Sequence, residues 1–137
     1  MGAEYPFAVL SGPTFAREVA SGLPAAAHIA SSNASFLESL YARFHSPIFH
    51  VKTSHDVIGI AVGGIMKNVI AIAAGIFDGL KLGANARAAL VTQGFQELIQ
   101  LGVALGGTID TLTGLSGFGD LILTALDDQS RNRRLGL

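Results

Sequence analysis

The sequence predicts an α/β segment over residues 1–54 followed by an all-α segment over residues 55–137. Two observations lead to this fold class. Up to Ser54, short stretches rich in strand-forming residues alternate with stretches of helical periodicity, whereas after His55 every apolar stretch has the period of a helix. Strands joined by helical crossovers form layered α/β sheets, and three short strands do not complete such a sheet. We therefore expect the first segment to be the second half of a larger domain.

The α/β segment is predicted to have the order strand, helix, strand, helix, strand. Strands are expected at residues 7–10, 25–30 and 48–53, and helices at residues 14–21 and 34–44. The stretch Ser-Gly-Pro-Thr-Phe-Ala at residues 11–16 follows the first strand and opens a helix. It places backbone N–H groups and a hydroxyl at the carboxyl end of a strand, where ligands often bind. A plain turn capped by Thr14 is the alternative.

The all-α segment is predicted to contain two long helices and three short ones. They are expected at residues 57–77, 86–105, 109–112, 120–126 and after residue 130. Asn85 and Ser130 have the side chains of helix N-caps, and the glycines at 106–107 and 114–119 are expected to separate the helices. The first strand starts almost at Met1 and the last helix has only just begun where the chain ends, so we expect the chain to be part of a longer protein.

The first long helix carries a single lysine, Lys67, in the middle of an apolar stretch. Placing an unpaired ammonium in a core costs on the order of several kcal/mol, so such a lysine usually serves a purpose. Gly63 and Gly64 lie one turn earlier and leave room for a substrate or a backbone to approach the ammonium. Because the helix is apolar on all sides, we expect it to be buried all round. Lys67 is the first candidate catalytic residue.

Two other interpretations of this helix remain open. A structural lysine could extend to the surface or neutralise a buried carboxylate. A membrane span would fit the length and the GxxxG spacing of Gly59 and Gly63. Lys67 and Asn68 at mid-span, and the lack of a flanking basic cluster, argue against a membrane span.

The composition excludes several classes of protein. Half of the residues are apolar, 14% are charged and the formal net charge is −1, so nothing favours binding to nucleic acid or to a membrane surface. There is no cysteine, which excludes disulfides and thiolate metal sites, and no signal-peptide pattern, so we expect a cytoplasmic protein. The four histidines lack the spacing of metal ligands and are expected to be ordinary structural or surface residues, so no metal is expected.

Two polar clusters follow in the helical segment. Asp120 ends a glycine-rich stretch and either caps the next helix or approaches Lys67, with Thr124 one turn later facing the same way. Ser130, Arg131 and Asn132 begin the last helix with donors that suit an anion such as phosphate. A solvated charged turn is the alternative for this second cluster.

Five segments in this order and spacing, at residues 11–20, 63–73, 85–90, 114–124 and 130–134, resemble the NAD(P)-dependent glycerol-3-phosphate dehydrogenases of the bacterial type. The resemblance implies that residues 1–54 are the second half of a Rossmann-like nucleotide-binding domain and residues 55–137 a helical catalytic domain. It also implies reversible hydride transfer between NAD or NADP and dihydroxyacetone phosphate, giving sn-glycerol 3-phosphate, a precursor of glycerophospholipids. The expected partners are this small substrate and, in a homodimer, a second copy.

The resemblance also implies roles for individual residues. Lys67 matches the proton acceptor and Asp120 a carboxylate beside it. The expected substrate contacts also include Gly12, Thr14, Ser130, Arg131 and Asn132, and the expected cofactor contacts are Ala16 and Arg131. Met66 and Gln93 stand where the family more often has leucine and arginine, which should not change the chemistry.

The chain lacks some of the parts that the resemblance implies. No GxGxxG fingerprint of dinucleotide binding follows a strand, and a second substrate lysine is also missing, so residues 1–137 alone should be inactive. Two alternatives remain open. One is another lysine-dependent dehydrogenase of the hydroxyacid type, and the other is a non-catalytic helical interaction domain.

Overall fold

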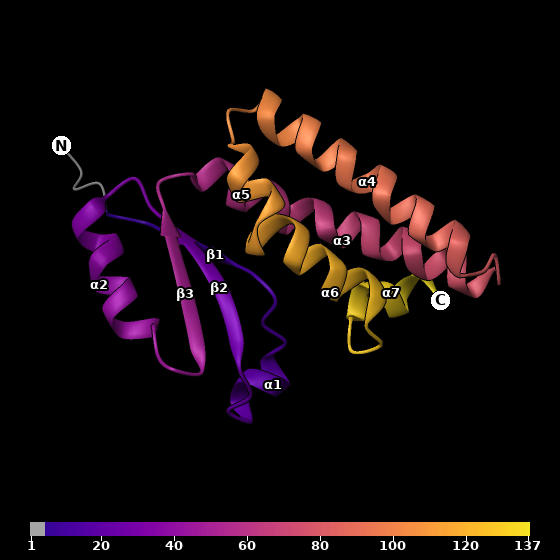
Figure 1. Ribbon diagram of the computed structural model, residues 1–137, viewed down its shortest axis with the longest axis horizontal. Helices are drawn as coiled ribbons and strands as arrows, with labels where there is room; N and C mark the ends of the chain where they lie inside the picture. The colour runs from indigo at the N-terminus through magenta and orange to yellow at the C-terminus, as the bar shows by residue number, and fades with distance from the viewer. Residues whose placement is uncertain (1–4) are drawn as a thin grey trace.

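The computed structural model describes residues 5–137, which form a small sheet with one covering helix and an adjoining set of helices (Figure 1). The strands are β1 (Val9–Ser11), β2 (Ala25–Ala30) and β3 (Phe49–Ser54). The helices are α1 (Ala16–Ala20), α2 (Ala34–Phe44), α3 (Val57–Gly79), α4 (Ala84–Ala104), α5 (Ile109–Thr113), the π-helix η1 (Leu115–Gly119), α6 (Asp120–Leu126) and α7 (Arg131–Gly136). This order agrees with the predicted one. Residues 1–4 of the predicted first segment lie outside the described residues.

The sheet has the strand order β1-β2-β3, and only one of the expected crossovers exists. β2 and β3 are parallel and joined through α2, but β1 and β2 are antiparallel. α1 has only five residues, and the chain turns after it so that β2 runs back along β1. In this antiparallel register Val9 is opposite Ala30 and Ser11 is opposite His28. Leu37 of α2 packs with Ile29 and Val51 to form the core on this side.

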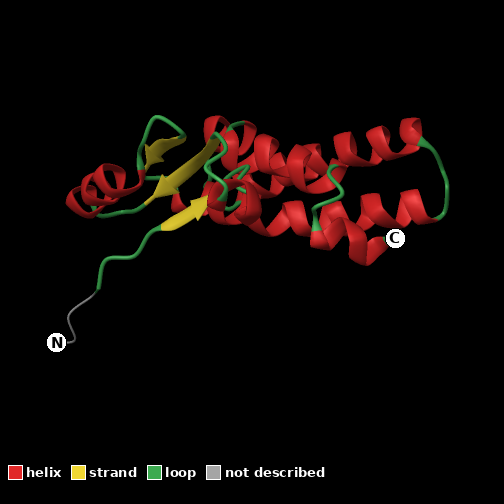
Figure 2. Ribbon diagram, turned by 90° about the horizontal axis from the view of Figure 1, so that it is seen from below, coloured by secondary structure: helices red, strands yellow, loops and turns green. Residues whose placement is uncertain are grey.

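α3 is the central helix of the all-α part, and Figure 2 shows the long helices at one end of the molecule and the strands at the other. Asp56 caps α3 because its Oδ1 accepts a hydrogen bond from the N–H of Gly59 at 2.7 Å. The core around α3 joins buried apolar residues of α3, α4, α5 and α6: Val62, Ile70, Ala71, Ala74, Val91, Leu98, Leu112, Leu121 and Ala125. The face of α3 that contains Lys67 is thus the buried one.

The prediction that α3 is buried on all sides is wrong for the described residues. Its opposite face carries Ile58, Ile65, Val69 and Ile76, whose side chains are between 45% and 65% exposed. The apolar pattern of a helix reports only on the helix itself, and no described element covers this face. α3 is also the one helix of residues 5–137 long and apolar enough to span a bilayer, with a mean hydropathy of 2.0. It packs against α4, α6 and α7 as a core helix does.

α7 lies directly against the second half of α3. A Cβ atom added at Gly75 of α3 or at Gly136 of α7 would overlap the backbone of the other helix, so both positions require glycine. Charge also joins these helices, because Arg133 of α7 and Arg87 of α4 both pair with Asp78 of α3. The start of α7 is therefore held at a defined place relative to α3.

Several predicted helix ends differ from those observed. Asn85 is not a cap, because α4 begins after Gly83, whose φ of 89° favours glycine. The glycine-rich stretch at 114–119 is not a plain break, because residues 115–119 form η1 and continue into α6. Ser130 does cap α7, since its Oγ accepts a hydrogen bond from the N–H of Arg133 at 3.2 Å.

Candidate active site

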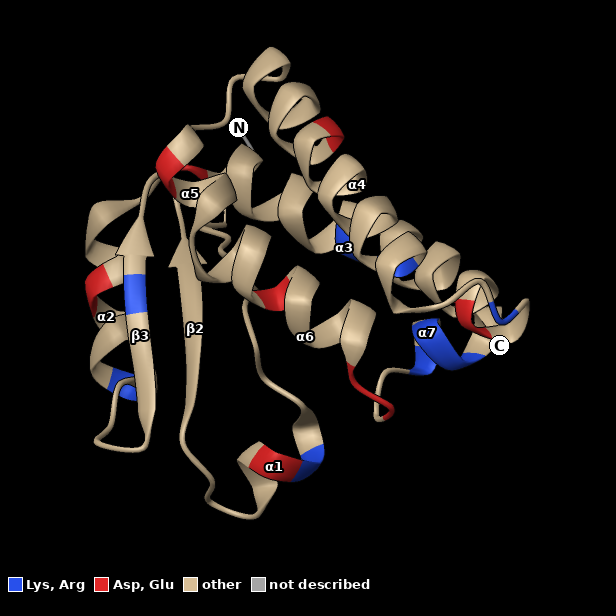
Figure 3. Ribbon diagram, turned by 45° about the vertical axis from the view of Figure 1, so that its right-hand side comes forward, with Lys and Arg blue, Asp and Glu red and all other residues tan. Residues whose placement is uncertain are grey.

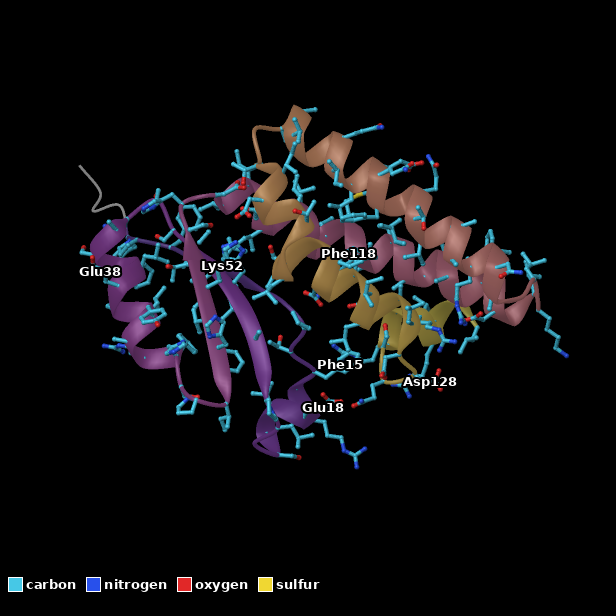
Figure 4. All side chains as sticks on the ribbon, viewed as in Figure 1. Phe15, Glu18, Glu38, Lys52, Phe118 and Asp128 are labelled. Carbon is cyan, nitrogen blue, oxygen red and sulfur yellow. The ribbon has the colours of Figure 1, made fainter. Side chains whose placement is uncertain are left out.

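A cavity of about 800 Å³ lies between the β1–α1 segment and helices α3, α6 and α7. Figure 4 shows Phe15 and Glu18 of the β1–α1 segment facing Asp128, which precedes α7. The two sides also touch, because Gln129 Nε2 donates a hydrogen bond to Glu18 Oε1 at 2.8 Å. The structure brings all eight predicted site residues into the lining of this one cavity: Gly12, Thr14, Ala16, Lys67, Asp120, Ser130, Arg131 and Asn132.

Lys67 and Asp120 form an ion pair at the cavity wall. Lys67 Nζ lies 2.5 Å from Asp120 Oδ2, and 21% of the lysine side chain is exposed against 3% of the aspartate side chain. The ammonium can therefore be reached from the cavity, while the carboxylate is nearly closed off from it. Of the two possibilities for Asp120, the approach to the lysine is correct, and the helix cap is wrong because Asp120 is already the first residue of α6. Lys67 does neutralise a buried carboxylate, and it faces a cavity as well.

Three donors converge on one oxygen of Asp120. Besides Lys67, the Ser11 hydroxyl at 2.9 Å and the Gly12 N–H at 3.0 Å donate to Oδ2. Thr124 faces the same carboxylate, and its Oγ1 lies 3.3 Å from Oδ1 and 2.6 Å from the backbone carbonyl oxygen of Asp120. These contacts join the sheet, α3 and α6 around a single carboxylate.

The β1–α1 turn requires glycine at position 12. Gly12 has a φ of 153°, and a Cβ there would lie 2.7 Å from the carbonyl oxygen of Ala26. This close approach directs the Gly12 N–H toward Asp120. Thr14 does not cap α1 as the alternative proposed, because its hydroxyl donates to the carbonyl oxygen of Gly12 at 3.2 Å and the cap position is Phe15.

The glycines before Lys67 admit other parts of the chain. A Cβ at Gly63 would lie 2.5 Å from the carbonyl oxygen of Ser116 in η1, and one at Gly64 would lie 3.3 Å from Ser11 Oγ. The expected approach to Lys67 is therefore made by the η1 backbone and by β1. This close packing fixes the helix that carries the lysine.

Asn68 is a cavity residue that the sequence reasoning missed. Its Nδ2 donates to the carbonyl oxygen of Gly64 at 3.1 Å, and its Oδ1 accepts a hydrogen bond from Asn132 Nδ2 at 2.7 Å. An amide next to the one lysine of an apolar helix was a usable signal, but it served only as an argument against a membrane span. The structure gives it a second role, because Asn68 connects α3 to the start of α7.

The cavity has an excess of positive charge. Four basic side chains line it, Arg17, Lys67, Arg131 and Arg134, against the two acidic side chains of Asp120 and Asp128. Both carboxylates are already paired, Asp120 with Lys67 and Asp128 with Arg133. Within residues 5–137 no ion pair involves Arg17, Arg131 or Arg134. Figure 3 shows basic residues on α7 and at α1, on either side of this space. The arrangement suits a small dianion.

His28 differs from the expectation of an ordinary histidine. It lies on β2, it is fully buried, and neither of its ring nitrogens has a hydrogen-bond partner within the described residues. Burial lowers the pKa of His28, and the nearby Lys52 lowers this pKa further. His28 does not line the cavity.

Comparison with known proteins identifies relatives across the whole chain. The family model described as NAD-dependent glycerol-3-phosphate dehydrogenase C-terminus matches residues 56–137, and the corresponding N-terminus model matches residues 1–37. Glycerol-3-phosphate dehydrogenase [NAD(P)+] of Thioalkalivibrio sulfidiphilus is 58% identical over 137 residues, and that of Mannheimia succiniciproducens is 53% identical over 138 residues. Both matches cover 100% of this chain and 41% of the relative.

Solved structures agree with these relatives. The crystal structure of glycerol-3-phosphate dehydrogenase from Coxiella burnetii matches with a TM-score of 0.94 at 53% identity, over 97% of this chain and 41% of that one. The structure from Saccharomyces cerevisiae matches with a TM-score of 0.79 at 31% identity, over 93% of this chain and 40% of that one. The chain thus spans about two fifths of the length of these relatives.

Proposed function

Because the chain belongs to the NAD-dependent glycerol-3-phosphate dehydrogenase family, we propose that the complete gene product interconverts dihydroxyacetone phosphate and sn-glycerol 3-phosphate with NAD(P)H. The product would supply glycerophospholipid synthesis. One observation carries the proposal for this chain, namely that the Lys67–Asp120 pair and the donors of Arg131 and Asn132 line the same cavity. A proton-transfer group and an anion-binding group are what a phosphorylated ketone requires.

Lys67 is the proposed acid and base. When the ketone is reduced, the C2 carbon gains a hydride and the C2 oxygen gains a proton, and the Lys67 ammonium gives that proton. When the alcohol is oxidised, the neutral amine takes the C2 hydroxyl proton. Asp120 holds the nitrogen at the cavity wall in both directions. Acid–base catalysis by one positioned group is worth about 10²- to 10⁴-fold in rate.

Arg131 and Asn132 are the proposed phosphate ligands. A guanidinium binds phosphate through two parallel charge-assisted hydrogen bonds, and the excess of basic side chains in the cavity favours a dianion. Asn68 supports Asn132, because the bond between the two amides leaves one N–H of the Asn132 amide for a ligand. Ser130 accepts from the Arg133 N–H, so its own hydroxyl hydrogen can still be donated to an anion.

Gly12 and Thr14 are the proposed contacts from the sheet side. The Gly12 N–H already donates a hydrogen bond to Asp120 Oδ2. We therefore propose that Gly12 contacts the substrate through van der Waals contact with its backbone and not through this N–H group. The Thr14 hydroxyl donates to Gly12 and can still accept a hydrogen bond from a substrate hydroxyl.

The residues present fit one end of a nicotinamide cofactor. The cavity is larger than a three-carbon phosphate needs, and Ala16 and Arg131 are both in its wall. Bound NAD(P)H would supply the hydride. No GxGxxG fingerprint follows a strand in these residues, so we propose that the main cofactor contacts lie outside residues 1–137. A cytoplasmic location and a homodimer complete the proposal.

The test measures oxidation of NADH and NADPH by the complete gene product with dihydroxyacetone phosphate. Lys67→Met should lower kcat at least 100-fold with an unchanged melting curve. Lys52→Met is the matched control, because Lys52 is a half-exposed lysine paired with Asp110 outside the cavity, and it should keep normal turnover. Near-normal kcat in Lys67→Met would contradict the assignment. Turnover of a 3-hydroxyacid but not of the phosphorylated ketone would support the hydroxyacid dehydrogenase instead.

A further inference from the structure

Ser11 ends β1 and is buried beneath the lysine–aspartate pair. The residue is 9% exposed, and its hydroxyl donates to Asp120 Oδ2, the same oxygen that contacts Lys67. Ser11 is not part of the cavity lining, whereas Gly12 beside it is. The Ser11 hydroxyl is therefore directed at Asp120 and not at the cavity, so its route to a ligand runs through Asp120.

The neighbours of Ser11 direct its hydroxyl group toward the Asp120 carboxylate. On one side lies Gly64 of α3, which has no side chain. A Cβ added at this position would lie 3.3 Å from Ser11 Oγ. On the other side lies the Asp120 carboxylate. The hydroxyl thus occupies the junction of β1, α3 and α6, and among residues 5–137 it donates its hydrogen bond to the carboxylate.

Without the Ser11 hydroxyl the Asp120 carboxylate would have fewer anchors. The Gly12 N–H and the Lys67 ammonium would remain on Oδ2, and on Oδ1 only the 3.3 Å contact with Thr124 Oγ1 would remain. Of the two groups left on Oδ2, only the Gly12 N–H belongs to the backbone, because the lysine is itself a flexible side chain. The terminal torsion of an aspartate has a broad energy minimum, so a carboxylate held this way can rotate. Any rotation would move Oδ2 and the Lys67 nitrogen with it, because the two atoms are 2.5 Å apart.

We propose that Ser11 is a positioning residue, which fixes Asp120 Oδ2 and through it the Lys67 nitrogen at the cavity wall. This inference rests on the proposed dehydrogenase function. Because Ser11 does not line the cavity, its loss acts on the proton-transfer geometry and not on substrate binding. The effect appears in kcat, while KM for the phosphorylated substrate stays nearly unchanged.

The first experiment compares Ser11→Ala with Ser31→Ala in the complete gene product. Ser31 is the matched control, because it is also buried and donates one hydrogen bond, to the carbonyl oxygen of Phe7 at 2.7 Å, without contacting Asp120. Ser11→Ala should lower kcat about 10- to 100-fold, since misplacing a reacting group by 1 Å costs on the order of 10²-fold. Ser11→Thr, which keeps the hydroxyl, should recover most of the loss. If Ser11→Ala and Ser31→Ala lower kcat equally, the proposal is overturned.

A double-mutant cycle tests whether Ser11 acts through Asp120. In an Asp120→Asn background, Ser11→Ala should change kcat by less than about twofold, because the carboxylate that it orients is gone. An equal loss in both backgrounds would overturn the proposal, since it would mean a role independent of Asp120.

A spectroscopic measurement keeps the inference separate from the proposed function. The ¹H–¹³C NMR chemical shifts of the Lys67 Cε–Hε group, measured in the complete gene product, should change in Ser11→Ala and remain unchanged in Ser31→Ala. If the gene product showed no dehydrogenase turnover, the proposed function would be wrong. The NMR measurement would still show whether Ser11 positions the Lys67–Asp120 pair. An unchanged resonance in Ser11→Ala would overturn the proposal.

Discussion

Asp78, near the end of α3, holds two other helices through charge. Its carboxylate accepts hydrogen bonds from one Arg87 nitrogen at 2.7 and 2.8 Å and from Arg133 Nε and Nη2 at 3.1 and 2.6 Å. Replacing Asp78 by Asn keeps the shape and removes the charge that both guanidinium groups share. Among the described residues, Arg133 would keep only its ion pair with Asp128, whose side chain is 92% exposed. We expect this change to loosen α7, which carries the proposed phosphate ligands.

The expected cost follows from the burial of the cluster. Removing one partner of a buried ion pair costs about 3–5 kcal/mol, and exposed pairs contribute less than about 1 kcal/mol. The Asp78 side chain is 15% exposed, that of Arg133 is 9% exposed and that of Arg87 is 27% exposed. The exposures of these three side chains are closer to those of a buried ion pair than to those of an exposed one. Asp78→Asn should therefore lower the free energy of unfolding by about 2–4 kcal/mol at neutral pH.

This stabilisation should depend on pH in one direction. The hydrogen bonds from Arg87 are the largest cause that lowers the pKa of Asp78 below its ordinary 3.8, and burial opposes them. A group whose pKa is lower in the folded state stabilises the protein above its unfolded-state pKa and loses that effect as the pH falls through its folded-state pKa. The difference between wild type and Asp78→Asn should therefore be full above about pH 5 and shrink below about pH 4.

Urea unfolding followed by far-UV circular dichroism measures this difference, with Asp110→Asn as the matched control. Asp110 also pairs with a basic side chain, Lys52, but its own side chain is 82% exposed, so its replacement should barely change stability. A loss in Asp78→Asn no larger than that in Asp110→Asn would refute the reasoning. A loss that stayed constant on acidification would assign the effect to packing instead of charge.

Two further predictions concern single residues. Burial lowers the pKa of His28 in the folded state, so on acidification the unfolded state takes up a proton first, and the free energy of unfolding should fall as the pH drops below about 6.5. Urea titrations at several pH values should show a smaller fall for His28→Leu. An equal fall in both proteins would contradict the role of His28. Arg131→Ala in the complete gene product should raise KM for dihydroxyacetone phosphate strongly and change the poor turnover of unphosphorylated dihydroxyacetone much less. Equal losses with both substrates would mean that Arg131 does not bind the phosphate.

The sequence predicted the features that depend on local chemistry. The α3 start and the cap at Ser130 follow from side-chain type and spacing. Asp56 caps α3 in the structure, but it was not singled out as a cap from the sequence. The catalytic role of Lys67 stays a prediction. The pairing of Lys67 with Asp120 was left open, because a buried ammonium needs a carboxylate but spacing along the chain does not say which one. The contact becomes evident from the packing of η1 on Gly63 and of α6 on the core around α3, which together place Asp120 beside the lysine.

Other features depend on what lies next to an element. The exposure of Ile65 and Val69 could not be read from an apolar helix, because the pattern is the same whether or not a neighbour covers that face. The antiparallel return of β2 could not be read from the sequence, because the connection between β1 and β2 is long enough for either direction of pairing. α1 is also shorter than the helix predicted at residues 14–21. That the His28 ring has no hydrogen-bond partner among residues 5–137 became visible only when the residues around β2 were known.

The position of Asn68 connects the two halves of the proposed chemistry. Lys67 and Asn68 are adjacent on α3, so the nitrogen that would move the proton and the amide that holds Asn132 are carried by one rigid turn. The backbone contact between Gly75 and α7 and the Asp78–Arg133 pair hold α7 to the same helix about two to three turns further on. The separation between the proposed acid–base group and the proposed phosphate ligands is therefore set mainly by α3 and not by a flexible loop. A rigid separation favours a substrate in which the reacting carbon and the phosphate lie at one fixed spacing.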